Sequence, residues 1–382
     1  MIHVIFWQSI VSMHQMPYIV YLQRIKPNWQ FTLVVENVLT TDRIAMGWNV
    51  PEFEDKNNLN IVSAPDENII EKLLLSKNSV HVFEGIKGFK LGWRVFKLAI
   101  KKDILAIIVM SEAPDLRGIR SITRRLFSWF LERRYRKEID LVFSIGQKSK
   151  DWYKWCEFNP NQLYEFCYVV EDKLFSQSIK TVQSDRGGYF EFVFIGSLLS
   201  LKGLDRLIHA FANIPNNQWH LSIFGEGKER SKIESLIITN NLQQNISLKG
   251  FKSNQEIREI LMAFDTLILP SYYDGWGAVI NEALTSGIPV ICSDAAGASD
   301  LITNPLLGTV FSSQSTKSLE GAILLALKKG KPTIEQRKEI YHWAQENISG
   351  LSIANYFVEI LEYYLENKVI PKPVAPWMQE KN

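Results

Sequence analysis

Two carboxylates flank a glycine-containing turn between residues 270 and 284. Asp274 stands immediately before Gly275-Trp276-Gly277, and Glu282 follows in a helix-forming stretch. Glycine permits tight, left-handed backbone, so a strand that ends near Pro270 can turn here into a helix that opens near Gly277. The N–H groups at a helix start attract anions, and carboxylates accept hydrogen bonds from hydroxyls. The pattern indicates a site for a phosphate-bearing, hydroxylated ligand; the alternative is a surface loop with two solvated carboxylates.

A second pattern with phosphate-binding chemistry begins near residue 191. The apolar run 192–195 predicts a buried strand, and Gly196, Ser197 and Lys202-Gly203 follow before apolar residues at helical spacing. A strand, glycine turn and helix start can cradle a diphosphate between backbone N–H groups and one ammonium. It is not a Walker loop, because the Gly-Lys-Ser/Thr order is absent. A lone loop lysine is ordinarily solvated, so the interpretation depends on the whole segment.

Together these segments resemble the donor-site signature of family 4 glycosyltransferases, retaining enzymes that use nucleotide sugars and have the GT-B fold. Asp274 and Glu282 correspond to the family's Glu-x7-Glu pair, with Asp in place of the first Glu. Lys202 corresponds to the lysine of its Gly-Arg…Lys-Gly segment, with Ser197 where many members carry Arg. Further strand-and-turn segments follow in the family's order, so that the resemblance covers residues 192–302.

The resemblance implies a role for each matched residue. Glu282 would hold ribose hydroxyls, Asp274 would hold sugar hydroxyls, and Lys202 would neutralise the leaving diphosphate together with backbone N–H groups. These three are the expected catalytic residues; neither a metal nor a cofactor is required, and a UDP- or GDP-sugar is the expected donor. The leaving diphosphate itself would help to deprotonate the acceptor hydroxyl on the same face of the sugar. The expected donor-binding residues are Gly196, Ser197, Lys202, Gly225, Gly250, Phe251, Lys252, Gly275, Trp276, Gly277, Ala278 and Glu282.

Length and element order predict two domains. A chain of 382 residues is too long for one ordinary core. Apolar runs near 2–7, 31–36, 79–83, 104–110 and 141–144 alternate with helical stretches, which is typical of a doubly wound α/β sheet. The resemblance to family 4 implies the GT-B class, with two Rossmann-like domains facing a cleft. Residues 1–170 would bind the acceptor, 171–345 the nucleotide sugar, a linker would lie near 170–188, and a last helix at about 346–370 would return to the first domain.

Two polar residues follow strands of the N-terminal half. His14 comes after the first predicted strand, and Glu112 comes after the strand that ends at Met110. At the carboxyl ends of parallel strands, such side chains can face a ligand. His14 is a candidate for binding an acceptor hydroxyl or the diphosphate, and Glu112 for binding or deprotonating the acceptor. A structural histidine and a helix-capping acid are the alternatives.

Positive charge is concentrated between residues 117 and 137, where eight basic residues stand against Glu132 alone. Apolar and aromatic residues interleave with them at near-helical spacing, and a basic amphipathic helix with Trp and Phe suits an anionic membrane surface. A core helix with a solvated basic face is the alternative; nucleic acid is not expected, because the net charge is only +2 and no nucleic-acid module is readable. The membrane-contact candidates are Arg124, Arg125, Trp129, Phe130, Arg133 and Arg134.

Composition narrows the protein class. The 46% hydrophobic and 22% charged content is that of a globular protein, and the apolar run 104–110 is too short to span a membrane. The first residues read as a strand rather than a signal peptide, and three cysteines argue against a disulfide framework. We expect a cytoplasmic enzyme, peripheral on the inner membrane face, that glycosylates a lipid-linked saccharide in O-antigen, capsule or exopolysaccharide synthesis. The alternatives are a nucleotide-sugar 2-epimerase of the same fold and a non-catalytic nucleotide-sugar-binding subunit.

Overall fold

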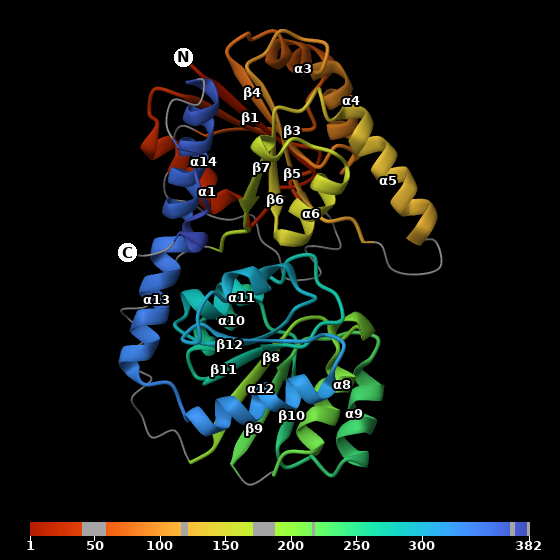
Figure 1. Ribbon diagram of the computed structural model, residues 1–382, viewed down its shortest axis with the longest axis vertical. Helices are drawn as coiled ribbons and strands as arrows, with labels where there is room; N and C mark the ends of the chain where they lie inside the picture. Colours follow the sequence, from red (N-terminus) through yellow and green to blue (C-terminus); the bar gives the residue numbers. More distant parts are fainter. Residues whose placement is uncertain (40–58, 116–120, 171–187, 216–217, 367–370, 380–382) are drawn as a thin grey trace. The chain divides into compact units, whose positions relative to one another are not determined.

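The computed structural model describes residues 1–39, 59–115, 121–170, 188–215, 218–366 and 371–379. The chain divides into two compact units, one formed by residues 1–171 with 350–382 and the other by residues 172–349 (Figure 1). The predicted linker near 170–188 and the basic residues Arg117 and Arg120 lie almost wholly outside the described residues. Each unit is described by itself below.

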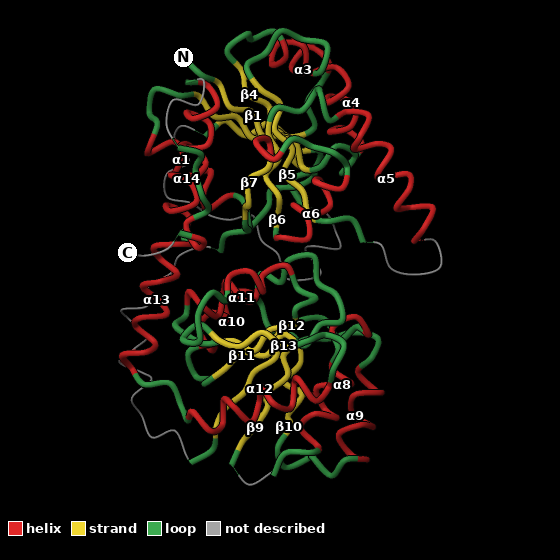
Figure 2. The backbone as a smooth tube through the Cα atoms, in the orientation of Figure 1, coloured by secondary structure: helices red, strands yellow, loops and turns green. Residues whose placement is uncertain are grey.

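The N-terminal unit is a seven-stranded sheet with helices packed on its faces (Figure 2). Its strand order is β3-β2-β1-β4-β5-β6-β7, and every neighbouring pair is parallel. Strands buried on both faces explain the nearly continuous apolar runs read from the sequence. The strands are β1 (His3–Gln8), β2 (Gln30–Val35), β3 (Asn60–Ser63), β4 (Ser79–Glu84), β5 (Ala106–Glu112), β6 (Leu141–Ile145) and β7 (Leu163–Phe166). The helices are α1 (Met16–Ile25), α3 (Glu67–Leu74), α4 (Lys90–Ala99), α5 (Ser121–Tyr135), α6 (Gln147–Trp155) and α14 (Gly350–Leu365).

The C-terminal unit is a second doubly wound sheet, with the parallel order β10-β9-β8-β11-β12-β13. One core cluster joins β8, α8, β9 and α12 through Phe192, Phe211, Trp219 and Ile323. The strands are β8 (Phe190–Ile195), β9 (Trp219–Phe224), β10 (Ile246–Gly250), β11 (Thr266–Leu269), β12 (Val290–Ser293) and β13 (Gly308–Phe311). The helices are α8 (Leu204–Ala212), α9 (Arg230–Thr239), α10 (Asn254–Leu261), α11 (Val279–Thr285), α12 (Thr316–Lys329) and α13 (Ile334–Ile348).

The expected GT-B class, with its two Rossmann-like sheets, is confirmed. The sequence did not indicate β3, β7 and β13, which have four residues each and lie at sheet edges. Two of these edge strands have few buried residues to mark them: β3 has none and β13 has one. Three of the four residues of β7 are buried, so there the short length of the strand is what left no clear pattern.

The last helix returns to the first unit, as the fold class predicts: α14 packs along α1. Gly350 makes the close approach possible, because a Cβ there would lie 2.7 Å from Tyr21 Cδ2. Phe357 then enters the core against Phe6 and Tyr18. The helix begins at Gly350 rather than at about 346, because Ser349 adopts an extended backbone (φ −71°, ψ 163°) that separates α14 from α13.

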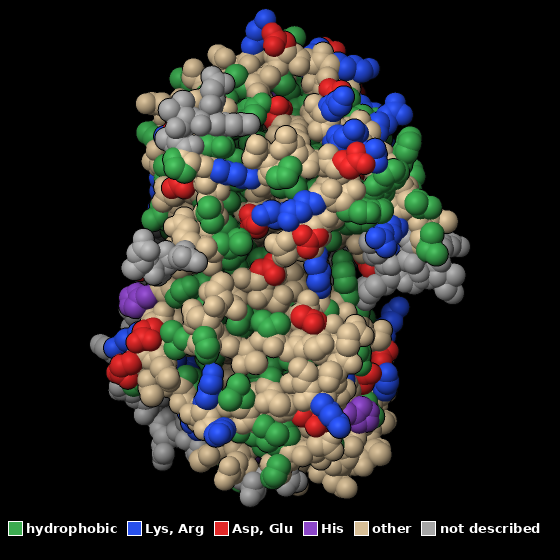
Figure 3. Space-filling model, viewed as in Figure 1, with side chains coloured by type: hydrophobic (Ala, Val, Ile, Leu, Met, Phe, Trp, Pro, Cys, Tyr) green, Lys and Arg blue, Asp and Glu red, His purple; other side chains and the backbone are tan. Residues whose placement is uncertain are grey.

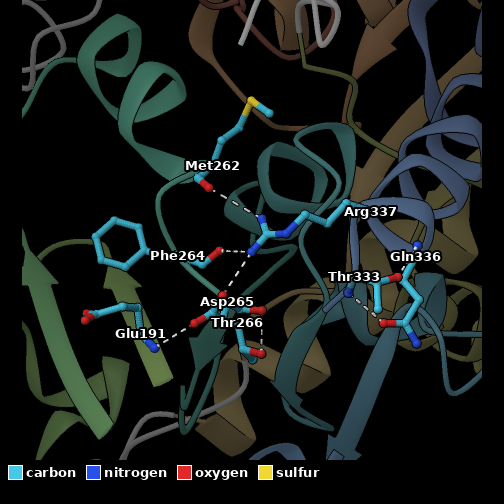
Figure 4. Close-up of polar contacts among 8 residues, drawn as sticks. All are labelled: Glu191, Met262, Phe264, Asp265, Thr266, Thr333, Gln336 and Arg337. Atoms are coloured by element: carbon cyan, nitrogen blue, oxygen red, sulfur yellow. Dashed lines mark hydrogen bonds and ion pairs between the residues drawn. The ribbon is translucent and has the colours of Figure 1, made fainter. Parts of the chain in front are cut away.

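A buried ion pair attaches α13 to the second unit (Figure 4). The guanidinium of Arg337 lies 3.1 Å from Asp265 Oδ1 and donates to the Phe264 carbonyl at 2.7 Å. The other Asp265 oxygen accepts from the backbone N–H of Glu191 at 2.9 Å, so one carboxylate joins α13 to the starts of β8 and β11. Arg337 is only 4% exposed and Asp265 only 1%.

Each sheet reverses its winding direction at one point. In the N-terminal unit β1 lies between β2 and β4, and in the C-terminal unit β8 lies between β9 and β11. Ligands of open α/β sheets bind at the carboxyl ends of the strands beside such a switch point. The loops after β1 and β4, and those after β8 and β11, are therefore where each unit would hold a ligand.

Candidate functional site

Lys202 and Asp274 form an ion pair at the switch point of the C-terminal unit. Lys202 ends the short 3₁₀ turn after β8, and Asp274 follows β11. Lys202 Nζ lies 2.6 Å from Asp274 Oδ2, and the two side chains are 19% and 14% exposed. The structure therefore joins the cation of one sequence motif to the carboxylate of the other.

The two loops that carry this pair interlock through their backbones. Gly203 has φ +69°, and a Cβ at this position would lie 2.1 Å from the Pro270 carbonyl oxygen. The Tyr272 N–H donates to the Leu201 carbonyl at 2.8 Å. Only glycine allows both the left-handed backbone and the close approach, so Gly203 is needed to hold Lys202 beside the Asp274 loop.

The expected donor-binding glycines gather at the carboxyl ends of β8, β9 and β10. Gly225 (φ +138°) packs so closely on Gly196 that a Cβ would lie 1.9 Å from the Gly196 oxygen, and its N–H donates to Gly250 at 2.8 Å. Three backbones thus meet in close contact, and this packing leaves no space for a side chain at Gly225. Ser197 beside them is exposed.

The remaining expected donor-binding residues differ in exposure and in their hydrogen-bond partners. Phe251 is 50% exposed after β10, and the Lys252 ammonium is engaged by Glu256 at 2.7 Å. Trp276 is only 2% exposed, and its indole donates to Asn281 at 2.8 Å. The Trp276 side chain therefore belongs to the core, and Trp276 can contact a ligand only through its backbone.

Gly275 and Gly277 shape the loop that follows Asp274. Gly277 has φ +94°, and Ala278 caps α11, so the helix begins slightly later than the sequence indicated. A Cβ on Gly297 would lie 2.4 Å from the Gly275 oxygen, because the loop after β12 packs against this turn. The turn is thus held between two neighbouring loops.

Glu282 lies in α11 with its carboxyl group surrounded by protein, although a minor part of the residue remains accessible. Burial raises the pKa of this carboxyl to about 7, with Arg258 opposing the shift. Burial of an ionisable group at a sheet switch point is typical of a ligand site. Within the described residues no group of three His, Cys, Asp or Glu side chains is arranged to hold a metal ion.

The N-terminal unit places both acceptor-side candidates in one polar cluster. The His14 imidazole stacks on Tyr168 with 5.8 Å between ring centroids, and Tyr168 hydrogen-bonds to Glu112. Burial, and then the nearby Glu112 charge, raise the pKa of Tyr168 well above its ordinary value. Glu84, at the end of β4, accepts from the Ser9 N–H and hydroxyl, each at 2.9 Å.

Sequence reasoning missed Glu84 and Tyr168. Glu84 ends an apolar strand just as Glu112 does, and this shared position was the available signal. Tyr168 follows the short edge strand β7, which the sequence did not reveal, so its place beside His14 had no local signal.

Helix α5 carries the membrane-contact candidates on two different faces. Trp129 turns toward the unit, where its indole donates to the Trp155 carbonyl at 3.4 Å and Arg133 lies 4.9 Å above its ring. Arg133 also pairs with Glu157. Phe130 is 61% exposed, and Arg124, Arg125 and Arg134 are exposed as well. Three further apolar residues of α5, which were not among the predicted membrane contacts, are exposed as well: Ile122, Leu126 and Phe127.

Comparison with known proteins identifies the C-terminal unit. Residues 176–346 match the family described as glycosyl transferases group 1. The C-terminal unit belongs to the group 1 glycosyltransferases. These are the family 4 enzymes that its donor-site motifs resemble, retaining hexosyltransferases with the GT-B fold.

The chain is similar to two glycosyltransferases whose names give the polymer concerned. It is 29% identical over 243 residues to poly(glycerol-phosphate) alpha-glucosyltransferase of Bacillus subtilis, covering 62% of this chain and 35% of that protein. It is 29% identical over 154 residues to the lipopolysaccharide glucosyltransferase WaaG of Escherichia coli, covering 39% of this chain and 40% of WaaG. The chain thus aligns with well under two thirds of the length of either relative.

The fold of the chain is also that of HepE from Anabaena, solved in complex with UDP. The two superpose with a TM-score of 0.70 at 15% identity, over 95% of this chain and all of HepE (100%). The lipopolysaccharide galactosyltransferase WaaB gives a TM-score of 0.69 at 15% identity. At this identity the likeness concerns the fold alone.

Proposed function

We propose that this protein transfers a sugar from a nucleoside-diphosphate donor to a hydroxyl of a lipid-linked saccharide, with retention of anomeric configuration. The observation that carries the proposal is the Lys202–Asp274 ion pair, 2.6 Å long, at the switch point between β8 and β11. It puts a cation and a carboxylate where a sugar diphosphate needs both. Family membership supports the reaction type.

Each charged group then has a distinct task. Lys202 would leave Asp274 for the diphosphate and neutralise the charge that grows as the sugar–phosphate bond breaks. Asp274 would take up sugar hydroxyls in its place, and Glu282 would hold the ribose. The developing diphosphate oxygen receives the acceptor proton, so the protein supplies orientation and charge stabilisation.

The acceptor side is proposed to lie in the N-terminal unit. His14, Glu112, Glu84 and Tyr168 form its polar cluster beside the strand ends of β1, β4 and β5. Carboxylates and a phenol hydroxyl can bind several sugar hydroxyls at once. This chemistry suits a saccharide acceptor.

A panel of donors tests the proposal. The protein is incubated with UDP-glucose, UDP-galactose, UDP-N-acetylglucosamine and GDP-mannose, with and without a short polyprenyl-diphosphate-linked saccharide. Acceptor-dependent release of nucleotide, with an α-linked product by NMR from an α-linked donor, is the expected result. Conversion of a nucleotide sugar without acceptor would identify an epimerase, and binding without turnover would identify a non-catalytic subunit.

An exposed apolar stripe on α5 supports a membrane-bound acceptor. Ile122, Leu126, Phe127 and Phe130 are 71%, 58%, 56% and 61% exposed, and their spacing puts them on one side of the helix. Hydrophobic side chains are visible along α5 in Figure 3. An apolar helix face bordered by arginines suits the headgroup region of an anionic bilayer, so we propose a peripheral enzyme of the inner membrane face. No described helix is long and apolar enough to cross a membrane.

Binding to vesicles tests this surface. Arg124→Gln/Arg125→Gln/Arg134→Gln is expected to weaken binding to phosphatidylglycerol vesicles about 10²-fold at low salt, at about 1 kcal/mol per arginine. Leu126→Gln/Phe130→Gln should release the protein as well, because the apolar anchor is lost. Leu324→Gln/Leu325→Gln on α12, 48% and 41% exposed, is the matched control and should bind normally. Wild-type protein that ignores these vesicles at low salt would refute the membrane surface.

Glu282→Gln should change stability and donor binding in opposite directions. The folded pKa of about 7 exceeds the unfolded value, so the wild type loses stability as pH rises from about 4.5 to about 7. A neutral Gln avoids this loss, and the variant should gain about 1–3 kcal/mol in free energy of unfolding at pH 8. Its donor affinity should fall, because charge-assisted hydrogen bonds worth about 1.5–3 kcal/mol become neutral ones. Urea unfolding at pH 5 and pH 8 and calorimetry with UDP measure both; unchanged donor affinity at pH 8 would remove Glu282 from the site.

A further inference from the structure

Arg206 is a buried arginine on α8 beside the proposed donor site. It is only 4% exposed. Its Nε donates to the Pro270 carbonyl at 2.7 Å, and its Nη2 donates to the same oxygen and to the Ser271 carbonyl at 2.6 Å. Its Nη1 donates to the Ser313 carbonyl at 2.7 Å, and Ser293 Oγ lies 3.4 Å from Nη2. One guanidinium therefore binds four residues of three different loops.

The three loops are those that follow β11, β12 and β13. Pro270 and Ser271 lead directly to Asp274, Ser293 ends β12, and Ser313 follows β13. The guanidinium also lies 4.2 Å from the Tyr272 ring centroid and 5.2 Å from that of Phe311. Arg206 thus joins α8, which begins just after Lys202, to the carboxyl ends of three neighbouring strands.

The second buried arginine of this unit has a different set of partners. Arg337 is equally buried, at 4% exposed, but it is neutralised by Asp265 at 3.1 Å (Figure 4). In the described part of the chain the polar partners of Arg206 are carbonyl and hydroxyl oxygens, with no carboxylate in an ion pair. Asp205 and Asp294 act on this guanidinium only at longer range than an ion pair. Burying it is therefore costly, and its planar set of donors needs another explanation than ion pairing.

We propose that Arg206 is a positioning residue that sets the separation of Lys202 and Asp274. The Arg206 guanidinium binds the carbonyls of Pro270 and Ser271, and the Leu201 carbonyl accepts from the Tyr272 N–H at 2.8 Å. Three successive residues of the Asp274 loop are therefore bound to the start of α8. Without these guanidinium bonds, the α8 start holds the Asp274 loop mainly through Gly203 packing and the Leu201 carbonyl, while the loop after β12 still binds Asp274 from its other side. This inference rests on the proposed function, because it concerns the geometry of that same donor site.

Arg206→Lys and Arg337→Lys provide the matched test. Lysine retains the charge in both, but a single ammonium cannot bind three loops in the planar pattern of a guanidinium. Arg206→Lys should lower kcat for the best donor about 10²-fold, the effect expected of a displacement of about 1 Å, with donor KM changed less than threefold. Arg337→Lys should lower the melting temperature and leave kcat of the folded protein unchanged. Circular dichroism and thermal unfolding confirm that the assayed protein is folded.

A double-mutant cycle with Lys202→Ala then separates positioning from general destabilisation. If Arg206 acts by aligning Lys202 with Asp274, the kcat loss from Arg206→Lys should shrink to less than threefold in the Lys202→Ala background. Equal losses in both backgrounds, or wild-type kcat in Arg206→Lys, would overturn the proposal. Arg206→Met removes both the charge and the hydrogen-bond donors and serves as a second variant. Its kcat should be at least as low as that of Arg206→Lys.

A failure of the proposed function can be distinguished from a failure of the Arg206 proposal. Wild-type protein that turns over none of the donors refutes the proposed reaction before any variant is compared. Calorimetry with UDP then still tests Arg206: its lysine variant should bind UDP, which carries the full charge of the leaving diphosphate, more weakly than the Arg337→Lys control, because Lys202 is misplaced. Equal UDP affinity in the two variants would refute the positioning role.

Discussion

Lys202→Ala is expected to lower kcat by about 10²–10³-fold at saturating donor, while donor affinity falls by less than tenfold. The ammonium acts most strongly when negative charge collects on the leaving diphosphate, and Ser197 provides no second cation beside it. Stopped-time assays of nucleotide release over a donor series separate kcat from KM. Full activity at saturating donor would remove Lys202 from the reaction.

The N-terminal unit offers a close control for this variant. Lys150 and Glu165 form another partly buried ion pair, with side chains 21% and 15% exposed, beside 19% and 14% for Lys202 and Asp274. Lys150→Ala should destabilise the fold about as much as Lys202→Ala. It should leave kcat of the folded protein unchanged, so that loss of a half-buried ion pair is distinguished from loss of the leaving-group cation.

Asp274→Asn is expected to tighten binding of UDP or GDP while lowering sugar transfer. In the structure Asp274 holds the Lys202 ammonium at 2.6 Å and so competes with any diphosphate for it. Neutral Asn removes the competitor and a nearby negative charge, so affinity for the nucleoside diphosphate should rise about five- to tenfold, which corresponds to about 1–1.4 kcal/mol. The transferred sugar loses a charged hydrogen-bond acceptor, so kcat should fall about 10²-fold.

Calorimetry with UDP and GDP, followed by donor kinetics, measures both effects of Asp274→Asn. Asp103→Asn makes the same change in net charge at an exposed position of the other unit, where Asp103 pairs with Lys77 at 2.8 Å. This control should change neither quantity. Weaker nucleotide binding in Asp274→Asn would show that Asp274 supports the diphosphate site instead of competing for it.

Local sequence signals predicted the elements that carry the site. A strand buried on both faces requires an apolar run, and a left-handed turn at a strand end favours glycine, so both leave marks within a few residues. The strands before Gly196 and Asp274 and the turn at Gly203 were readable for this reason. Together with the motifs they carry, these elements resemble family 4 glycosyltransferases, which implied the GT-B class, and the comparisons confirm both.

Side-chain direction on α5 was only partly readable. The basic and aromatic composition predicted an amphipathic helix, and α5 is present over Ser121–Tyr135. Trp129 nevertheless turns inward, because Trp155 of α6 lies beside it with 5.8 Å between ring centroids. The sequence of α5 does not contain the position of α6, so it could not show which aromatic residues remain exposed.

Partners distant in the chain were decided by the tertiary structure alone. Parallel strands are joined through helices, so Lys202 and Asp274 meet only because β8 and β11 are neighbours in the sheet. The same is true of Arg206, which reads in the sequence as one more charged residue of a helix start. Arg206 binds three loops because the carboxyl ends of β11, β12 and β13 lie together beside α8. The sequence by itself determined which residues stand at the ends of the strands. The order of the strands in the sheet determined which of these residues meet, because contacts across a sheet depend on neighbouring strands that no local sequence pattern encodes.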